Sequence, residues 1–124
     1  MKMVKLSLKG NPKSNQHIYQ YCCRGKFGTL YMTKIGKDIK EDYVKQIKSQ
    51  YKGKPIEEDV EMEVVLYFGD KKRRDIDNYG KLLDCLNGTI LVDDSQIQKL
   101  TIKKDYSKEE PRIEIVIKPL LKTP

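Results

Sequence analysis

Residues 60–68 read VEMEVVLYF, and this stretch has the clearest strand pattern in the chain. Side chains of an extended chain alternate between two sides, so a strand with one buried face carries an apolar residue at every second position. Here the apolar series is Val60, Met62, Val64, Leu66 and Phe68. The intervening positions begin with two glutamates and end with Val65 and Tyr67, which is typical of a strand that enters the middle of a sheet. We therefore predict a central strand over 60–68.

Three other segments show the same alternation and are predicted strands. They are residues 3–8, a segment that begins at 97–102, and residues 113–117. Residues 19–32 are ambiguous, because Gly25 and Gly28 break any helix while residues 29–32 fit a short strand.

Helical spacing appears between these strands. From about Gly36 to Tyr51 the apolar residues recur at intervals of three and four, which predicts an amphipathic helix. Gly53 and Pro55 are expected to end it. A second helix is predicted over 79–86.

This second predicted helix has a possible start signal and stop signal in the sequence. Asp77 or Asn78 would serve as its N-cap, and the dipeptide Asn87–Gly88 would stop it. The order of elements predicts an α/β (α+β) fold, with a single small mixed sheet and two main helices packed on it. We expect one domain over 1–124, in which about 119–124 form a loose tail.

The composition narrows the functional class. The chain of 124 residues carries 25 Lys and Arg against 18 Asp and Glu, for a net charge of +7. Such a surplus favours a polyanionic partner, although an anionic membrane surface or no partner at all would also be compatible with it. No apolar stretch is long enough to span a bilayer, and the N-terminus lacks the apolar region of a signal peptide. With three cysteines that cannot all pair, we expect a cytoplasmic, reducing location.

The chemistry is concentrated in residues 71–96, KKRRDIDNYGKLLDCLNGTILVDDSQ. Four consecutive cations, Lys71, Lys72, Arg73 and Arg74, open the stretch. Five aspartates follow without a single glutamate: Asp75, Asp77, Asp84, Asp93 and Asp94. Taken separately, the aspartates and the cationic run each have an ordinary structural explanation. Such aspartates often cap turns, and such a cationic run is often a solvated surface. The combination is the informative feature.

The spacing of the acidic residues allows them to act together. Asp75 and Asp77 lie on the same side of an extended backbone. If Asp77 caps a helix, Lys81 lies one turn along the same side. Of Asp93 and Asp94, only one can face such a cluster if the segment is extended.

Carboxylates repel phosphate, so an acidic cluster behind a cationic run approaches DNA only with a cation between them. Mg²⁺ fits this role, because it binds through one or two carboxylates together with water and phosphate oxygens. Lys81 would then stabilise developing charge or orient a water molecule, and the 71–74 run would contact the DNA backbone. Other chemistries have little support, since His17 is the only histidine and the cysteines lack metal-ligand spacing.

The stretch RRDIDNYGKLLDCLNGTILVDDSQI, residues 73–97, closely resembles the signature of RusA-type Holliday junction resolvases, which are small phage-associated endodeoxyribonucleases. The segment Asn11–Asn15 is similar to the N-terminal loop of that family, and the likeness extends over most of the chain. The resemblance implies a RusA-like fold, cleavage of four-way DNA junctions in recombination and repair, Mg²⁺ dependence with Mn²⁺ as a substitute, and a homodimer. It also implies a phage or prophage gene in a bacterial cell.

The resemblance also assigns residues. Its metal-binding aspartates fall on Asp75, Asp77 and Asp94, with Asp93 in support, and its catalytic lysine falls on Lys81. Lys71, Lys72, Arg73, Arg74, Asn15 and Asn78 are the expected DNA-binding residues. Asp84 matches an acidic position whose role the resemblance leaves open.

Two other functions remain as alternatives to the nuclease. The first is a non-catalytic basic DNA-binding protein that retains the fold, although a protein that only binds gains nothing from carboxylates beside phosphate. The second is a structural protein without a nucleic-acid partner, which would show no salt-sensitive DNA affinity.

Overall fold

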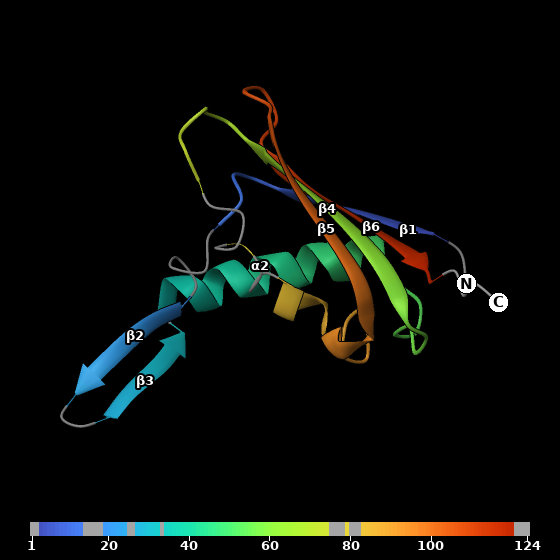
Figure 1. The fold of residues 1–124 in the computed structure, drawn as a ribbon, viewed down its shortest axis with the longest axis horizontal. Helices are drawn as coiled ribbons and strands as arrows, with labels where there is room; N and C mark the ends of the chain where they lie inside the picture. Colours follow the sequence, from blue (N-terminus) through green and yellow to red (C-terminus); the bar gives the residue numbers. More distant parts are fainter. Residues whose placement is uncertain are drawn as a thin grey trace.

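A computed structural model describes residues 3–13, 34–74, 79 and 83–120, together with the backbone of 19–24 and 27–32. Its centre is a four-stranded mixed sheet in the order β1-β6-β4-β5 (Figure 1). The strands are β1 (Val4–Lys9), β4 (Val60–Phe68), β5 (Ile97–Tyr106) and β6 (Arg112–Pro119). Strand β4 pairs antiparallel with β6 and parallel with β5, and β1 pairs antiparallel with β6. The predicted central strand is therefore confirmed, with a neighbour on each side.

Helix α2 (Lys34–Gln50) lies across one face of this sheet (Figure 1). Its buried stripe includes Tyr43 and Ile47, as the spacing of apolar residues predicted. The last turns of the helix also bind the edge of β1. Ser7 N donates to Gln50 Oε1 at 2.8 Å, and Gln50 Nε2 donates back to Ser7 O at 2.7 Å. Lys9 N donates to Gln46 Oε1 at 2.8 Å, so helix side chains bond three backbone groups in the second half of β1.

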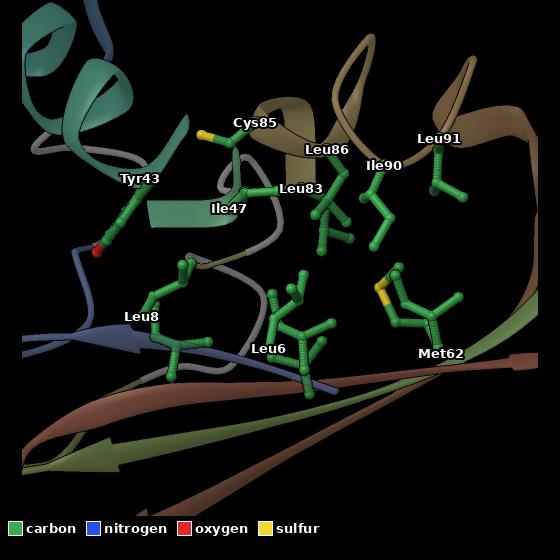
Figure 2. Packing of buried hydrophobic residues seen from close by; sticks show 14 of the residues in the cluster. Leu6, Leu8, Tyr43, Ile47, Met62, Leu83, Cys85, Leu86, Ile90 and Leu91 are labelled. Carbon is green, nitrogen blue, oxygen red and sulfur yellow. The ribbon is translucent and has the colours of Figure 1, made fainter. Parts of the chain in front are cut away.

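The core lies between the sheet, α2, Tyr79 and residues 83–91 (Figure 2). Alternate strand residues supply its lower layer, among them Leu6, Leu8, Val60, Met62, Leu66, Ile113, Ile115 and Ile117. The chain between β4 and β5 supplies Leu83, Leu86, Ile90 and Leu91, of which the last three are fully buried. Tyr79 and the apolar residues of 83–91 thus cover the sheet beside α2 and complete the core.

The prediction of two main helices is wrong for the part of the chain that the structure describes. Residues 83–86 form only a short 3₁₀ segment, and residues 80–82 lie outside the described residues. The carbonyl oxygen of Leu86 accepts from Thr89 N, Ile90 N and Leu91 N, at 3.2, 3.2 and 3.1 Å. With Gly88 at φ +75°, these bonds turn the chain into a compact loop. The predicted stop signal at Asn87–Gly88 is present, but it follows a short segment and not a long helix.

The ambiguous region forms strands. β2 (Tyr19–Arg24) and β3 (Phe27–Met32) pair antiparallel in a separate two-stranded sheet, which Figure 1 shows apart from the four-stranded sheet. At the other end of the chain, β6 includes Pro119, and Leu120 N donates to Asp59 O at 3.4 Å. Residue 119 of the predicted tail thus belongs to β6, and residues 121–124 lie outside the described residues. In the described part of the chain, no helix has the length and apolarity needed to cross a membrane.

Candidate metal and DNA site

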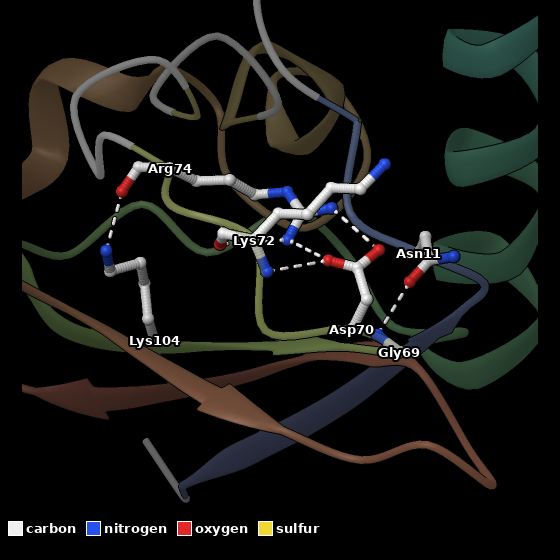
Figure 3. Close-up of polar contacts among 6 residues, drawn as sticks. All are labelled: Asn11, Gly69, Asp70, Lys72, Arg74 and Lys104. Carbon is white, nitrogen blue, oxygen red and sulfur yellow. Dashed lines mark hydrogen bonds and ion pairs between the residues drawn. The ribbon is translucent and has the colours of Figure 1, made fainter.

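The chain that leaves β4 forms a tight, charged loop over residues 69–74, here called the 69–74 loop (Figure 3). Arg74 binds Asp70 through both guanidinium Nη atoms, with Nη1–Oδ1 at 2.7 Å and Nη2–Oδ2 at 3.1 Å. Lys72 N donates to the same carboxylate at 3.0 Å. The hydrogen bonds from Arg74 and then from Lys72 lower the pKa of Asp70 to about 2. Asp70 is therefore an anion throughout the neutral range and a constant partner of Arg74.

The Arg74 side chain also packs on an aromatic pair. Its guanidinium lies over the Phe68 ring at 4.3 Å from the centroid. Tyr79 meets the same ring edge-on, with centroids 5.4 Å apart and an interplanar angle of 71°. Burial raises the pKa of the Tyr79 hydroxyl, and the charge of Arg74 partly opposes that shift. Arg74 and Tyr79, which flank residues 75–78, thus converge on Phe68.

Neighbouring segments fix the 69–74 loop in place. Gly69 N donates to Asn11 Oδ1 at 2.9 Å, and Lys104 Nζ from β5 donates to Arg74 O at 2.6 Å (Figure 3). Gly10 N donates to Pro111 O at 3.0 Å. A Cβ atom on Gly69 would lie 2.9 Å from Pro111 Cγ, so a glycine is needed where these loops meet. The loop is therefore anchored to the N-terminal loop and to β5.

The four cations predicted to bind DNA divide into two groups. Lys71, Lys72 and Arg73 are exposed, and Lys71 Nζ lies 5.1 Å from the centre of the Tyr106 ring. Arg74 is different, because its side chain is 22% exposed and paired with Asp70. The exposed group is available to phosphate, whereas the guanidinium of Arg74 already has a carboxylate partner.

The aspartate pair before β5 lies in a second well-fixed turn, residues 93–96, here called the 93–96 turn. It contains the short 3₁₀ helix η2 (Asp94–Gln96), which Asp93 caps by accepting from Ser95 N at 3.2 Å. Hydrogen bonds from Ser95 lower the pKa of Asp93. Asp93 thus serves as the cap of the turn, and Asp94 is its first helical residue.

Gln96 is the buried centre of the 93–96 turn. Its Oε1 accepts from Asp93 N at 2.8 Å, which completes a capping box. Its Nε2 donates to Ile56 O at 2.7 Å and to Glu58 O at 2.9 Å. Only 8% of Gln96 is exposed, so one amide connects the turn to the segment before β4. The side chains of Asp93 and Gln96 therefore hold the turn that contains Asp94.

The remaining predicted site residues, Asp75, Asp77, Asn78, Lys81 and Asn15, lie outside the described residues. Within the described ranges, no group of three or more acidic, histidine or cysteine side chains could hold a metal ion. Whether the predicted ligands converge thus stays a prediction. The structure does connect the 69–74 loop and Asp94 to the same strand, β5. The loop is bonded by Lys104 of β5, and Asp94 lies in the turn that leads into the first residue of β5. The donor chemistry fits Mg²⁺, because all predicted ligands are carboxylates.

Three residues that fix the 69–74 loop and the 93–96 turn were not predicted from the sequence: Asp70, Lys104 and Gln96. The spacing of Asp70 and Arg74, four residues apart, is a known signal for an ion pair, although it is normally applied to helices. The Asp93-x-x-Gln96 pattern is a capping-box signal. Lys104 carried no local signal, because its partner lies 30 residues away.

Together these features define a small basic α+β domain in which a cationic loop leads directly into an aspartate-rich segment, as expected of a protein that acts on nucleic acid. The family described as Endodeoxyribonuclease RusA matches residues 9–118, which is nearly the whole chain. The chain belongs to the RusA endodeoxyribonuclease family, and the resemblance predicted from residues 73–97 is confirmed.

A sequence relative has a shorter match. The chain is 51% identical over 45 residues to the uncharacterized protein YqaN of Bacillus subtilis (strain 168). The match covers 36% of this chain and 31% of that protein. The aligned region thus spans less than a third of that protein's length, and its printed name assigns no activity.

Proposed function

We propose that this protein is a Mg²⁺-dependent endonuclease, with Mn²⁺ as a possible substitute, that resolves four-way DNA junctions by paired symmetric cuts. The observation that carries the proposal is the family match over residues 9–118, which spans the cationic loop and every predicted acidic ligand. The structure supports it through the 69–74 loop, whose exposed cations directly precede Asp75.

Each part of the site has a chemical role in this proposal. Lys71, Lys72 and Arg73 bind the DNA backbone, because they are exposed cations on an anchored loop. Asn15 and Asn78 are proposed to add polar contacts to the DNA. Lys81 is proposed to stabilise the negative charge that develops on the phosphate during hydrolysis.

The metal ligands are proposed to be Asp75, Asp77 and Asp94. When bound, Mg²⁺ would supply an activated water molecule and stabilise charge on the phosphate oxygens. The hydrolysis adds water across one P–O ester bond, which leaves a phosphate on one strand end and a hydroxyl on the other. Asp93 supports Asp94, because its carboxylate caps the turn that presents its neighbour.

A homodimer is the proposed active form. A four-way junction has two-fold symmetry, and two equivalent cuts on opposite strands resolve it. A two-fold dimer with one site per subunit supplies both cuts. The proposed place of action is the cytoplasm of a bacterial cell, with a phage or prophage as the source of the gene.

The direct experiment is a cleavage assay on a synthetic four-way junction, with a linear duplex of the same length beside it. With Mg²⁺ we expect paired nicks in the junction only, and without a divalent ion we expect binding alone. Asp75→Asn and Asp94→Asn should abolish cleavage while junction binding survives or tightens, because each removes a metal ligand and a negative charge. The measurement combines gel-resolved cleavage with a mobility-shift affinity.

Asp38→Asn is the matched control, since it makes the same charge change at an exposed position of α2. It should cleave like the wild type. Binding of the junction without cleavage under any divalent ion would instead identify a DNA-binding protein that retains the fold. Cleavage that persists in Asp94→Asn would remove that residue from the metal site.

A further inference from the structure

Arg74, the residue immediately before the first predicted metal ligand, is held by hydrogen bonds from its side chain and to its backbone. Asp70 binds both Nη atoms of Arg74, the residue next to Asp75, at 2.7 and 3.1 Å. The carbonyl oxygen of Arg74, the last acceptor before Asp75, accepts from Lys104 Nζ at 2.6 Å. Both the side chain and the backbone of the preceding residue are therefore fixed.

The far end of the same segment is also anchored. Tyr79, which follows residues 75–78, is 5% exposed and meets the Phe68 ring edge-on. Arg74 lies over that same ring at 4.3 Å. Arg74 and Tyr79, the described residues on either side of 75–78, are therefore both fixed against Phe68, and the ligands of a metal site depend on such fixed supports.

We propose that Asp70 and Lys104 are positioning residues of the nuclease site, which act by fixing Arg74, the residue that precedes the segment 75–78 with the proposed ligands Asp75 and Asp77. On this view Arg74 acts as a structural connector and not as a phosphate ligand. The inference rests on the proposed function, because it assigns the ligands to this segment. Groups that support metal ligands are typically worth about 10- to 100-fold in metal affinity or activity.

The charges support this division of roles. The ion pair of Asp70 and Arg74 has no net charge, so it adds little attraction for a phosphate. Arginine binds a carboxylate in a two-pronged geometry that fixes orientation as well as distance. The exposed Lys71, Lys72 and Arg73 keep their positive charge for the DNA backbone. Binding and positioning therefore fall on different residues of one loop.

The first test compares Asp70→Asn with the wild type in three measurements. They are kcat and KM on a four-way junction, junction affinity in EDTA, and the affinity for MnCl₂ by titration calorimetry without DNA. We expect kcat to fall about 10-fold and the Kd for Mn²⁺ to rise about 10-fold. Junction affinity should stay the same or tighten, since a negative charge is lost. Asp70→Glu should recover part of both losses.

Matched controls exist on β5. Asp105→Asn makes the same charge change at the same end of the sheet, where the carboxylate accepts from Tyr106 N at 2.7 Å and lies outside the 69–74 loop. It should leave kcat and Mn²⁺ affinity unchanged. Lys104→Met and Lys103→Met each remove one positive charge from adjacent residues, and only Lys104→Met should lower kcat and Mn²⁺ affinity.

A double-variant cycle separates positioning from phosphate binding. If Asp70 and Arg74 act as a unit, Asp70→Asn combined with Arg74→Gln should lose no more kcat than the worse single variant. If Arg74 were a phosphate ligand, Arg74→Gln would weaken junction binding and reduce its salt dependence by about one ion, while Asp70→Asn left kcat unchanged. That second pattern would overturn the proposal.

The outcomes also distinguish this inference from the proposed function. A wild type that binds Mn²⁺ but cleaves no branched DNA would refute the nuclease, and the Mn²⁺ affinities of the variants would still judge the positioning role. Unchanged Mn²⁺ affinity and kcat in both Asp70→Asn and Lys104→Met would refute the positioning role alone. Circular dichroism checks that each variant is folded, and if Asp70→Asn is unfolded, Lys104→Met decides the question.

Discussion

The 69–74 loop and the 93–96 turn fix the two predicted halves of one site by opposite physical means. The 69–74 loop relies on charge: an ion pair between partly exposed side chains and a lysine on a carbonyl oxygen. The 93–96 turn relies on burial: a neutral amide, Gln96, bonded to three backbone groups. Ionic contacts near water weaken with salt and acid, whereas buried amide contacts do not. One half should therefore respond to solution conditions and the other should not.

The largest expected effect is on the buried side of this comparison. Gln96→Leu removes the hydrogen bonds of Gln96 with Asp93 N, Glu58 O and Ile56 O, while Ile56 O keeps a bond from Val92 N at 3.3 Å. A buried polar group without a partner costs roughly 1–3 kcal/mol, so the free energy of unfolding should fall by about 3 kcal/mol. Urea denaturation measures it. The control Gln98→Leu, at an exposed position two residues on, should change stability by no more than about 0.5 kcal/mol.

A smaller effect is expected where the 69–74 loop meets its neighbours. The Cβ atom of Gly69→Ala would lie 2.9 Å from Pro111 Cγ and 3.2 Å from Asn11 Oδ1. Forcing atoms this close typically costs about 1–3 kcal/mol, which should appear as a lower urea midpoint. Pro111→Ala removes the nearest atom, so Gly69→Ala should cost less in that background. Equal costs in both backgrounds would show that the contact with Pro111 is not the cause.

The smallest effect on stability is expected for the ion pair itself. Asp70→Asn should lower the urea midpoint slightly at low salt, and the difference should vanish near 1 M salt, because the pair is open to solvent. The same salt should leave the cost of Gln96→Leu unchanged. A salt-insensitive loss in Asp70→Asn would erase the proposed contrast between the two regions.

The pH dependence of the Asp70 carboxyl tests the same ion pair directly. The pKa of Asp70 is lowered from 3.8 to about 2, so the pair contributes stability above about pH 4 that is lost as the pH falls toward 2. A carbon-13 titration of the Asp70 carboxyl should give a midpoint near 2. In Arg74→Gln the midpoint should move up toward the ordinary value. An unchanged midpoint would mean that Arg74 is not the cause of the lowered pKa.

The sequence predicted the sheet and α2 well because both depend on periodic burial. The alternation at 60–68 is the local pattern of a strand with one buried face, and β4 begins at Val60 and ends at Phe68 as predicted. The second helix was predicted from a cap and a stop, which mark where a turn can begin and end but not how long it lasts. The contacts of Leu86 with the following residues decide that, and they depend on packing against the sheet.

The candidate site was predicted unevenly for a similar reason. Its acidic and basic residues are visible as a cluster in the sequence, and the range 9–118 that the family matches includes that cluster. The groups that fix the neighbouring loop and turn are not visible in the sequence, because Lys104 and Gln96 bond partners that lie 30 and 40 residues away. Arg74 illustrates the limit: in the sequence it is the fourth of four equal cations, and in the structure it has a partner of its own.

The glutamines of α2 that bind β1 have a consequence for how the sheet can grow. Gln46 and Gln50 bond the outward amides of Lys9 and Ser7 and the carbonyl oxygen of Ser7, so the second half of β1 offers fewer open backbone groups to an added strand. The opposite border, β5, pairs with β4 alone among the described strands. A second subunit or an aggregating neighbour that adds a strand to this sheet should therefore favour the β5 side.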